Sequence, residues 1–530
     1  MRRYATAVAA AMVLLLGAGS TAHAATPPPS EFGNDWDDPR TATPPIARPD
    51  GPSCTIRIVN HQFVNFDPFV GAYAPPAECA GPWQTVVLTV HGAVRGRQFD
   101  RLGRLAIGGA TIFKTSTPEP SVDGIAWTVE KDVTAYSALL SRPQQVTMWL
   151  GNVVDDTYTG VLDIQADLTF YPGGRPTGTP DDVLPLADTA SDGPDTTGSL
   201  TVARNTERLV AEVYATGSGG GCEEFWYITA PSASGYSCPA DNGPYREVQV
   251  LVDGEIAGIA MPYPHIYTGG WSNPFLWYAI PAPRAFNVAP VTYDLSPFVG
   301  RLTDGKRHQV RVHVLGVPAG QGGWEAPTNF FAWRDAGSAV VAGALLASHV
   351  SELDNAVTVG SSDVTVAAAH KFTAVGYVQT SHGRVTYNVQ RTVGNTSHHV
   401  WGEQENPDAL KAEWTDNSTV VVAGRQPSIT VHNARYLLDG SVIISAENRL
   451  TTTFTVTDAA THSTVGPKSS TRWTQDDTFT GTASWTLGVP RPDRHATGTS
   501  RQRYQLHGDT CYDHTIATVN GYFTEDSSGC

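Results

Sequence analysis

The sequence is poor in charged residues, and it is poorest in lysine. Charged side chains make up 16% of the 530 residues, and only 6 of the 35 basic residues are lysines. Soluble domains usually carry roughly one quarter charged residues. Acidic residues outnumber basic ones by 51 to 35, which gives a net charge of −16. Nucleic acids and anionic membrane surfaces are bound through an excess of Lys and Arg, so we expect neither as a partner.

Long hydrophobic runs are also absent beyond the N-terminus. Residues 1–24 resemble a signal peptide, with two arginines, an apolar stretch over residues 5–17 and a small-x-small cleavage site at residues 22–24. The next apolar stretch, residues 339–347, has about half the length that a membrane span requires. We therefore expect a protein secreted through a Sec-type signal peptide and not held in a membrane.

Several catalytic and metal-binding signatures are missing as well. The sequence has no Cys-x-x-Cys and no His-Glu-x-x-His motif, which argues against a zinc site. It also has no nucleophile motif of the Gly-x-Ser-x-Gly kind in a strand–turn–helix setting, and no phosphate-binding loop. We therefore expect no metal and no cofactor.

The six cysteines fall into three local pairs, Cys54 with Cys79, Cys222 with Cys238 and Cys511 with Cys530. Other pairings are formally open, but short loops favour the nearest partner. In an exported chain such pairs form disulfides rather than metal sites. We expect three bridges, each stabilising the fold by about 2–4 kcal/mol.

The remaining pattern is almost entirely that of β-structure. Residues 309–314 alternate polar and apolar side chains, and Asp253-Gly254 lies between two strand-like runs, which is typical of a hairpin. Asp439-Gly440 has the same setting and predicts a second hairpin. No long segment shows the period of a helix. The sequence predicts an all-β protein, with two tandem jelly-roll-like β-sandwiches followed by a further β-rich C-terminal unit.

Composition also predicts the domain boundaries. We expect a signal peptide at 1–24, a Pro-rich leader at 25–52, a first sandwich at 53–170, a Pro- and Gly-rich linker at 171–198, a second sandwich at 199–335 and the C-terminal unit at 336–530. Arg101 and Arg246 each lie eight residues before a turn glycine, Gly109 and Gly254. This spacing indicates a repeat with one topology, although any two antiparallel sandwiches share hairpins and alternation.

The first cluster that could carry chemistry is residues 95–101, where three arginines flank Asp100. Guanidinium groups favour the charged form of a carboxylate and would lower the pKa of Asp100. A solvated, basic strand end has the same composition, so both interpretations stay open at this point.

The second cluster is Cys222 to Tyr227, in which Glu223 and Glu224 precede three aromatic residues. If this segment is a strand, its two carboxylates face opposite sides and only one points into a given site. An apolar neighbour or a second carboxylate raises a carboxyl pKa and makes a proton donor near neutral pH. The alternative is a salt-bridged edge strand.

A loop rich in aromatic residues follows, and it has two equally supported interpretations. Its rings could cap the core of a sandwich, or they could bind the apolar faces of sugars. The residues concerned are Tyr263, His265, Tyr267, Trp271, Phe275, Trp277 and Tyr278.

Together these motifs resemble the peptide-N4-(N-acetyl-β-glucosaminyl)asparagine amidase A family, the almond-type peptide:N-glycanases. The resemblance rests on residues 96–101, 115–120, 127–134, 223–227, 243–248, 266–270 and 302–306. It covers about residues 54–333 and is less distinct beyond them. It implies hydrolysis of the amide between the N-linked glycan and asparagine, which gives a glycosylamine and aspartate. The implied substrates are N-glycosylated peptides or glycoproteins.

At a distance the chain is also similar to the bacterial peptide:N-glycanase F, a pair of jelly rolls with the site between them. There an Asp-Arg pair after a strand and a Cys-x-Glu carry the catalytic carboxylates. The matching residues here are Asp100 with Arg101, and Glu224 rather than Glu223. The resemblance thus implies that Asp100 activates water and that Glu224 orients the reacting groups or protonates the leaving nitrogen.

The remaining assignments follow from the chemistry of amide hydrolysis, which needs positive charge near the developing oxyanion. We assign that charge to Arg101 with Arg246. We expect Glu223, Trp226, Arg246, Tyr267 and Trp271 to bind substrate in a site between the two sandwiches of a monomer. Two other classes stay open, a non-catalytic carbohydrate-binding protein and a glycosidase that uses the same carboxylates.

Overall fold

The computed structural model describes residues 39–119, 124–467, 470–490 and 493–530. Almost every element in these residues is a β-strand. The two described α-helices, α2 (Ser137–Leu140) and α3 (Val299–Leu302), have four residues each. The prediction of an all-β protein is therefore confirmed. No described helix is long and apolar enough to cross a membrane. The expected signal peptide, residues 1–24, lies outside the described residues.

The first sandwich consists of two antiparallel four-stranded sheets. One has the order β1 (Cys54–Phe63), β8 (Val161–Pro172), β3 (Trp83–Arg95), β6 (Ile125–Asp132), and the other has the order β2 (Phe69–Tyr73), β7 (Gln144–Leu150), β4 (Leu102–Ile107), β5 (Ala110–Ser116). The sheets pack face to face, because the rings of Tyr73 on β2 and Phe170 on β8 stack with centroids 6.5 Å apart.

The second sandwich repeats this strand order with one added edge strand, β10. One sheet runs β9 (Asp182–Pro185), β19 (Thr328–Arg334), β12 (Thr206–Val213), β16 (Val291–Asp294), and the other runs β10 (Ala187–Asp192), β11 (Asp195–Leu200), β17 (His308–Leu315), β14 (Glu247–Val252), β15 (Glu255–Ala260). Arg101 precedes β4 and Arg246 precedes β14, which hold the same place in their sheets. Asp253-Gly254 forms the expected hairpin between β14 and β15.

Two segments that we expected to be irregular are built into the fold. The expected linker 171–198 supplies β9, β10 and most of β11, so strands of the second sandwich begin at Asp182 instead of Ser199. Its prolines are compatible with this role because β9 pairs only with β19, and edge strands tolerate proline. Within the expected leader, Ala42 is fully buried and its N–H donates to the side chain of Gln502 at 2.8 Å.

The C-terminal unit is one eleven-stranded antiparallel sheet with strands of up to nineteen residues. Its strands are β20 (Ala342–Val350), β21 (Asp354–Val359), β22 (Asp363–Thr380), β23 (Gly383–Trp401), β24 (Asp408–Ala423), β25 (Ser428–Ile444), β26 (Arg449–Val465), β27 (Ser470–Thr486), β28 (Thr497–His507), β29 (Cys511–Val519) and β30 (Tyr522–Ser528). The hairpin expected at Asp439-Gly440 is wrong, because both residues lie inside β25.

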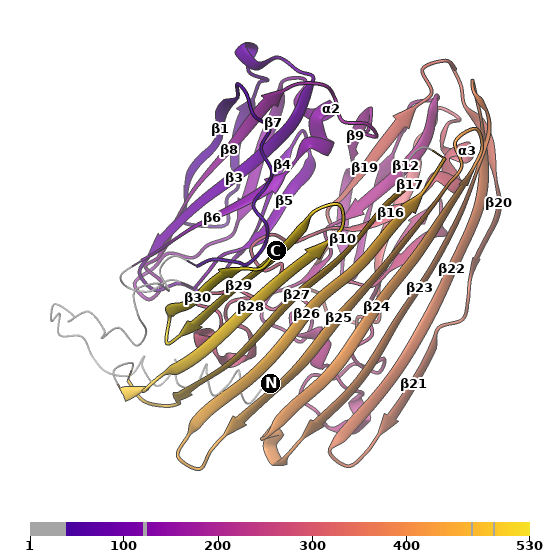
Figure 1. The fold of residues 1–530 in the computed structure, drawn as a ribbon. Coiled ribbons are helices and arrows are strands. Elements are labelled where there is room, and N and C mark those ends of the chain that lie inside the picture. The colour runs from indigo at the N-terminus through magenta and orange to yellow at the C-terminus, as the bar shows by residue number, and fades with distance from the viewer. Residues whose placement is uncertain (1–38, 120–123, 468–469, 491–492) are drawn as a thin grey trace.

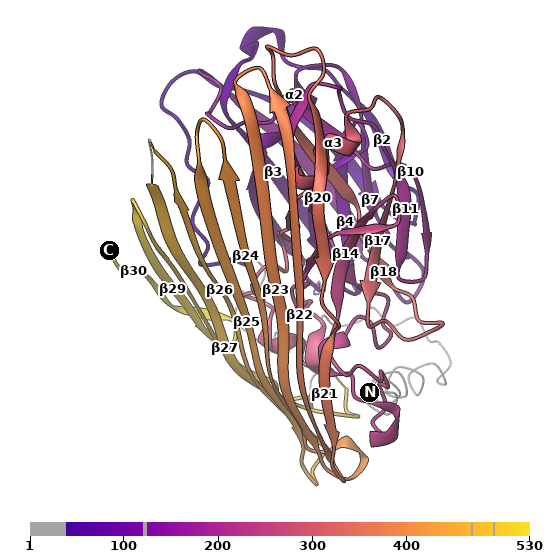
Figure 2. The same ribbon diagram turned by 90° about the vertical axis from the view of Figure 1, so that its right-hand side faces the viewer.

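One face of this sheet covers the second sandwich, and the other faces solvent (Figures 1 and 2). Burial alternates along β22 accordingly. On the covered face Gly376 approaches the sandwich so closely that a Cβ there would lie 2.0 Å from the carbonyl oxygen of Pro297. The buried side chain of Asp458 accepts two hydrogen bonds from Arg284, at 2.6 and 2.7 Å. Apolar packing and a buried ion pair therefore join the two units.

The three disulfides pair the cysteines as expected, Cys54–Cys79, Cys222–Cys238 and Cys511–Cys530. Three bridges and no free cysteine indicate a protein that folds in an oxidising compartment.

The close approach at Gly376 gives a test of the interface. Gly376→Ala places a methyl group against a backbone carbonyl that cannot rotate away, so we expect the free energy of unfolding to fall by about 1–3 kcal/mol. Gly174→Ala is the control, since a Cβ there meets nothing within 4 Å. Chemical denaturation measures both, and equal stability of the two variants would contradict the packing described here.

Candidate active site

Asp100 lies in the turn between β3 and β4, where a buried glutamine fixes the backbone. The side-chain amide of Gln98 donates to the carbonyl oxygens of Val153 and Gly160, at 2.8 and 3.2 Å. Its oxygen accepts hydrogen bonds from the N–H of Phe99 and from the guanidinium of Arg101. The motif 96–101 therefore holds Asp100 and Arg101 in a defined orientation.

The second sandwich reaches Asp100 through the loop between β15 and β16. The N–H of Gly269 donates to Asp100 Oδ2 at 3.3 Å. Glu119, which follows β5, approaches the same glycine, because a Cβ at Gly269 would lie 2.7 Å from Glu119 Oε1 and 3.4 Å from Asp100 Oδ1. Two carboxylates thus converge on one point of the backbone, and only glycine leaves room for them.

Glu224 is the third carboxylate of this cluster. Its side chain accepts a hydrogen bond from the N–H of Gly220, in the glycine-rich turn before it. Burial, opposed by the hydrogen bond from Gly220 and assisted by the charge of Asp100, raises the pKa of Glu224 to about 7. Burial and then the charge of Asp100 raise the pKa of Glu119 to about 8. Near neutral pH Glu119 therefore keeps its proton, and Glu224 lies close to the midpoint of its titration.

Burial also raises the pKa of Asp100, against the opposing effects of the Gly269 hydrogen bond and the charge of Arg101. The expectation of a lowered pKa is wrong because burial outweighs the charge of Arg101, and because Arg97 and Arg104 contact aromatic rings. Arg97 lies over the ring of Tyr158, 5.5 Å from its centroid, and Arg104 lies 3.8 Å from that of Trp149. Arg101 is the cation that acts on Asp100.

Arg101 has an unused hydrogen-bond donor. Its Nη2 donates to Gln98, while its buried Nε has no partner among the described residues. A guanidinium held in this way can donate to an oxygen of a bound substrate.

Glu223 and Arg246, both assigned to substrate binding, form a buried ion pair instead. Their side chains are 1% and 0% exposed. Arg246 donates to the two carboxylate oxygens of Glu223 at 2.9 and 2.6 Å, and Trp324 Nε1 donates to the same carboxylate at 2.7 Å. The remaining Nη1 of Arg246 donates to the carbonyl oxygens of Gly243 and Tyr245. Neither side chain is free to contact a substrate.

This pair also corrects the local structure expected there. Residues 222–225 form turns ahead of the short 3-10 helix η5 (Trp226–Ile228), so Glu223 and Glu224 are not on opposite faces of a strand. Glu223 points into the protein and anchors the turn to β14, while its neighbour Glu224 remains partly exposed at the carboxylate cluster.

The three aromatic residues assigned to substrate binding have different surroundings. Trp226 is 2% exposed and packs edge-to-face on Trp414 of β24, so it belongs to the core. Tyr267 donates to the carbonyl oxygen of Gly217 at 3.0 Å, and the charges of Glu224 and Asp100 contribute to its raised pKa. Trp271 is partly exposed and stacks on Tyr227 with centroids 6.5 Å apart.

Glu119 is the residue of this cluster to which the sequence analysis gave no role. It lies in the motif 115–120, directly after the strand that pairs with β4. The available signal for Glu119 was its place shortly after β5, the strand that pairs with β4 next to Asp100. Its convergence with Asp100 depends on Gly269 of the other sandwich and could not be read from spacing.

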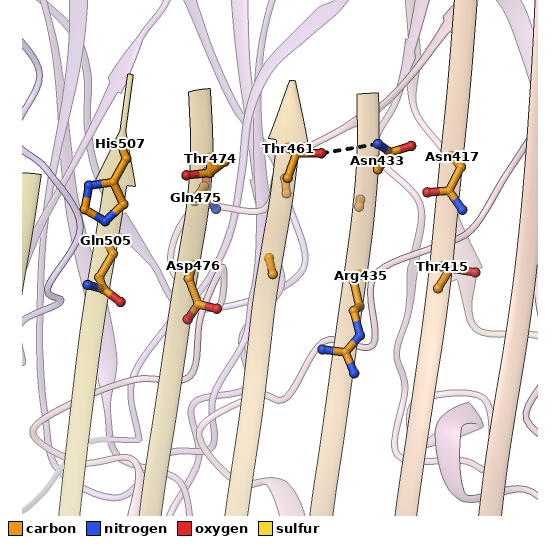
Figure 3. Close-up of a pocket in the computed structure, with 13 residues that line it drawn as sticks. Thr415, Asn417, Asn433, Arg435, Thr461, Thr474, Gln475, Asp476, Gln505 and His507 are labelled. Atoms are coloured by element: carbon orange, nitrogen blue, oxygen red, sulfur yellow. Dashed lines mark hydrogen bonds between the residues drawn. The ribbon is translucent and has the colours of Figure 1, made fainter. Parts of the chain in front are cut away.

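Other polar clusters lie away from these carboxylates. A groove of about 430 Å³ on the exposed face of the C-terminal sheet is lined by polar residues of β24 to β28 (Figure 3). Glu207, Asp335 and His382 place ligand atoms within 4.8 Å of one another. The carboxylate of Asp335 already accepts four hydrogen bonds, from Gly337, Ser338 and twice from Ser381. That cluster is better explained as a hydrogen-bonded junction than as a metal site.

The buried pair can be tested by its stability. Glu223→Gln leaves the Arg246 guanidinium buried without a counter-charge, so we expect a loss of about 3–5 kcal/mol in the free energy of unfolding. Asp167→Asn is the control, because Asp167 also binds an arginine through two hydrogen bonds, with Arg57 45% exposed. Exposed pairs contribute about 0–1 kcal/mol. Equal losses in chemical denaturation would refute the structural role of Glu223.

Comparison with known proteins places this cluster in a known family. A family model described as Peptide N-acetyl-beta-D-glucosaminyl asparaginase amidase A matches residues 39–334. Peptide-N4-(N-acetyl-beta-glucosaminyl)asparagine amidase A of Prunus dulcis is 29% identical over 431 residues, which are 74% of this chain and 74% of that protein.

Two solved structures show weaker similarity. The structure of PNGF-II in the P21 space group has 14% identity and a TM-score of 0.38, over 53% of this chain and 66% of the other, just under two thirds of its length. That of the PBSX exported protein XepA has 10% identity and a TM-score of 0.15, over 53% and 86%. Neither is close enough to support a conclusion about this fold.

The family match includes all members of the site. Asp100, Arg101, Glu119, Glu224 and Gly269 lie within residues 39–334, and that range is more than half of the 530 residues. The resemblance seen in the motifs is therefore confirmed, and this chain belongs to the peptide N-acetyl-β-D-glucosaminyl asparaginase amidase A family.

Proposed function

We propose that this protein is a peptide:N-glycanase that hydrolyses the amide between asparagine and the first N-acetylglucosamine of an N-linked glycan. The products are a glycosylamine and a peptide with aspartate in place of asparagine. The observation that carries this proposal is the cluster of Asp100, Glu119 and Glu224 beside Arg101, inside the region that defines the family.

We assign a role to each group from its position in the cluster. Asp100, the carboxylate beside Arg101, accepts a proton from water as the water oxygen attacks the amide carbonyl carbon. The partly exposed guanidinium of Arg101 stabilises the oxyanion that develops there. Glu224, with a pKa of about 7, donates a proton to the leaving nitrogen as the C–N bond breaks. The reaction then leaves a carboxylic acid on the peptide and an amine on the sugar.

Glu119 serves this arrangement as a neutral acid. With a pKa of about 8 it keeps its proton near neutral pH. A protonated Glu119 next to Asp100 avoids the repulsion of two charges at Gly269, and its O–H can donate to Asp100 or to the substrate. We assign substrate contacts also to Tyr267 and Trp271, which lie next to the Glu224 turn.

We infer further that each sandwich is a jelly roll and that the site lies between the two. The strand orders β1-β8-β3-β6 and β2-β7-β4-β5 support the first inference. Asp100 and Glu119 come from the first sandwich, whereas Glu224 and Gly269 come from the second. The three disulfides support secretion through the expected signal peptide, and we propose that the protein acts as a monomer.

The central test is cleavage of an N-glycosylated peptide, followed by mass spectrometry of both products. Asp100→Asn and Glu224→Gln should each lower kcat/KM by about 10²–10⁴-fold, and the double variant should be little worse than the worse single one. Asp156→Asn, an exposed carboxylate of the same sandwich, should be fully active.

The reaction products distinguish the amidase from a glycosidase and from a carbohydrate-binding protein. Asparagine that becomes aspartate supports the amidase, whereas N-acetylglucosamine retained on asparagine indicates a glycosidase. Binding without any product indicates a carbohydrate-binding protein. An Asp100→Asn variant with the wild-type rate and an unchanged melting temperature would overturn the assignment of the base.

Glu119 predicts how stability depends on pH. Its folded-state pKa of about 8 lies above the usual 4.5, so the folded state holds a proton that the unfolded state releases. This contribution is complete below pH 4.5 and is lost as the pH rises through the folded-state pKa. We expect the free energy of unfolding to decrease between about pH 5 and 8 and this slope to be smaller in Glu119→Gln. Glu78→Gln, on the surface, should keep the wild-type slope, and identical slopes in all three proteins would refute the burial of Glu119.

A further inference from the structure

The loop that brings Gly269 to Asp100 continues into a strained turn. Trp271, two residues later, has φ 56° and ψ 30°. This left-handed conformation is unfavourable for a bulky residue and persists only where surrounding contacts hold it, most often near functional sites. The question is which contacts hold this turn.

Those contacts come from the C-terminal sheet. Thr452 of β26 is fully buried, and its hydroxyl donates to the carbonyl oxygen of Trp271 at 3.4 Å. The same hydroxyl oxygen accepts a hydrogen bond from the side chain of Asn273 at 3.2 Å. Asn273, also fully buried, donates as well to the carbonyl oxygen of Ala483 on β27 at 2.8 Å. One threonine thus ties both sides of the strained turn to the sheet.

The ring of Trp271 is held by the same sheet. It packs edge-to-face on Phe454, with centroids 4.9 Å apart. A Cβ at Gly440 of β25 would lie 3.1 Å from Cη2 of Trp271 and 2.7 Å from the ring of Phe454, which explains a glycine within a long strand. On its other side Trp271 stacks on Tyr227, whose raised pKa reflects burial and then the charge of Glu224.

We propose that the C-terminal sheet is a positioning element of the active site, and that Thr452 is the positioning residue that holds the turn 270–273 and, through it, the N–H of Gly269 against Asp100. This inference rests on the proposed amidase function. The groups that act on Asp100 by charge are Arg101, Glu119, Glu224 and Tyr267. All of them lie in the two sandwiches, so the sheet acts through geometry and contributes no charge of its own to Asp100.

The test compares two threonines that are adjacent in sequence. Thr452→Val keeps the volume of the side chain but removes both hydrogen bonds of the turn. We expect kcat on a glycopeptide to fall about tenfold, since small displacements of a positioned group are costly. Because the Gly269 N–H stabilises charged Asp100, its displacement should also move the acidic limb of the pH–rate profile to higher pH.

Two further variants isolate the hydroxyl. Thr452→Ser keeps it and should restore kcat and the pH profile. Thr453→Val is the matched control, because Thr453 is exposed on the other face of β26 and shares a hydrogen bond only with Thr482. If Thr452→Val and Thr453→Val have the same kcat and the same pH profile, the positioning role of Thr452 is refuted.

A measurement without substrate keeps this result separate from the proposed function. Carboxyl-carbon NMR follows the titration of Asp100 directly, and we expect its pKa to be higher in Thr452→Val than in wild type and in Thr453→Val. An unchanged titration overturns the inference even if the enzyme is active. A wild-type protein that cleaves no glycopeptide overturns the proposed function, while the titration still decides whether the sheet holds Gly269 against Asp100.

Discussion

The hydrogen bond from Gly269 to Asp100 is the contact on which the site depends, because it joins the two sandwiches at their carboxylates. Three carboxyl groups gather around it, and burial disfavours a charge on each of them. The cluster can exist near neutral pH only if some of its members keep their protons. Packing therefore supplies protonated carboxyl groups, which can act as general acids in amide hydrolysis.

The two sandwiches have an arginine at an equivalent position, and each arginine has a different partner. Arg101 and Arg246 precede equivalent strands, β4 and β14. In the first sandwich the residue before the arginine is Asp100, and the guanidinium keeps a free donor beside it. In the second sandwich the guanidinium is buried against Glu223 and fixes the turn that carries Glu224. Arg101 thus lies beside Asp100, while Arg246 holds the turn that carries Glu224.

Sequence patterns correctly predicted the strands, turns and disulfides that depend on residues close together in the chain. The alternation of residues 309–314 and the turn at Asp253-Gly254 gave correct strands, and cysteine spacing gave the three bridges. Asp439-Gly440 has the same hairpin signal, yet Gly440 lies within a strand because two aromatic rings pack against it from distant segments. The Pro-rich stretch 171–198 was assigned to a linker because composition does not distinguish a linker from edge strands.

The same limit applies to the site. Motifs predict roles for Asp100, Arg101 and Glu224, but adjacent carboxylates in sequence do not reveal which one is buried, and Glu223 was assigned to substrate binding for that reason. Arg246 was misassigned with it, since a charged residue near a site resembles a catalytic one until its partner is known. The pKa of Asp100 was expected in the wrong direction because the sequence does not reveal its burial, and because the nearby Arg97 and Arg104 lie over aromatic rings.

The aromatic loop between β15 and β16 packs in part as a core element, whereas sugar binding by its other rings stays a prediction. At one end Trp277 is fully buried against Phe454 and Phe479 of the C-terminal sheet. At the other end Tyr267 lies at the carboxylates. The family match ends at residue 334, but the residues that hold this loop in its strained form lie beyond it, in β25, β26 and β27. The carboxylates of the candidate site lie within residues 39–334, whereas the contacts to the strained turn that follows Gly269 come from a sheet outside that region.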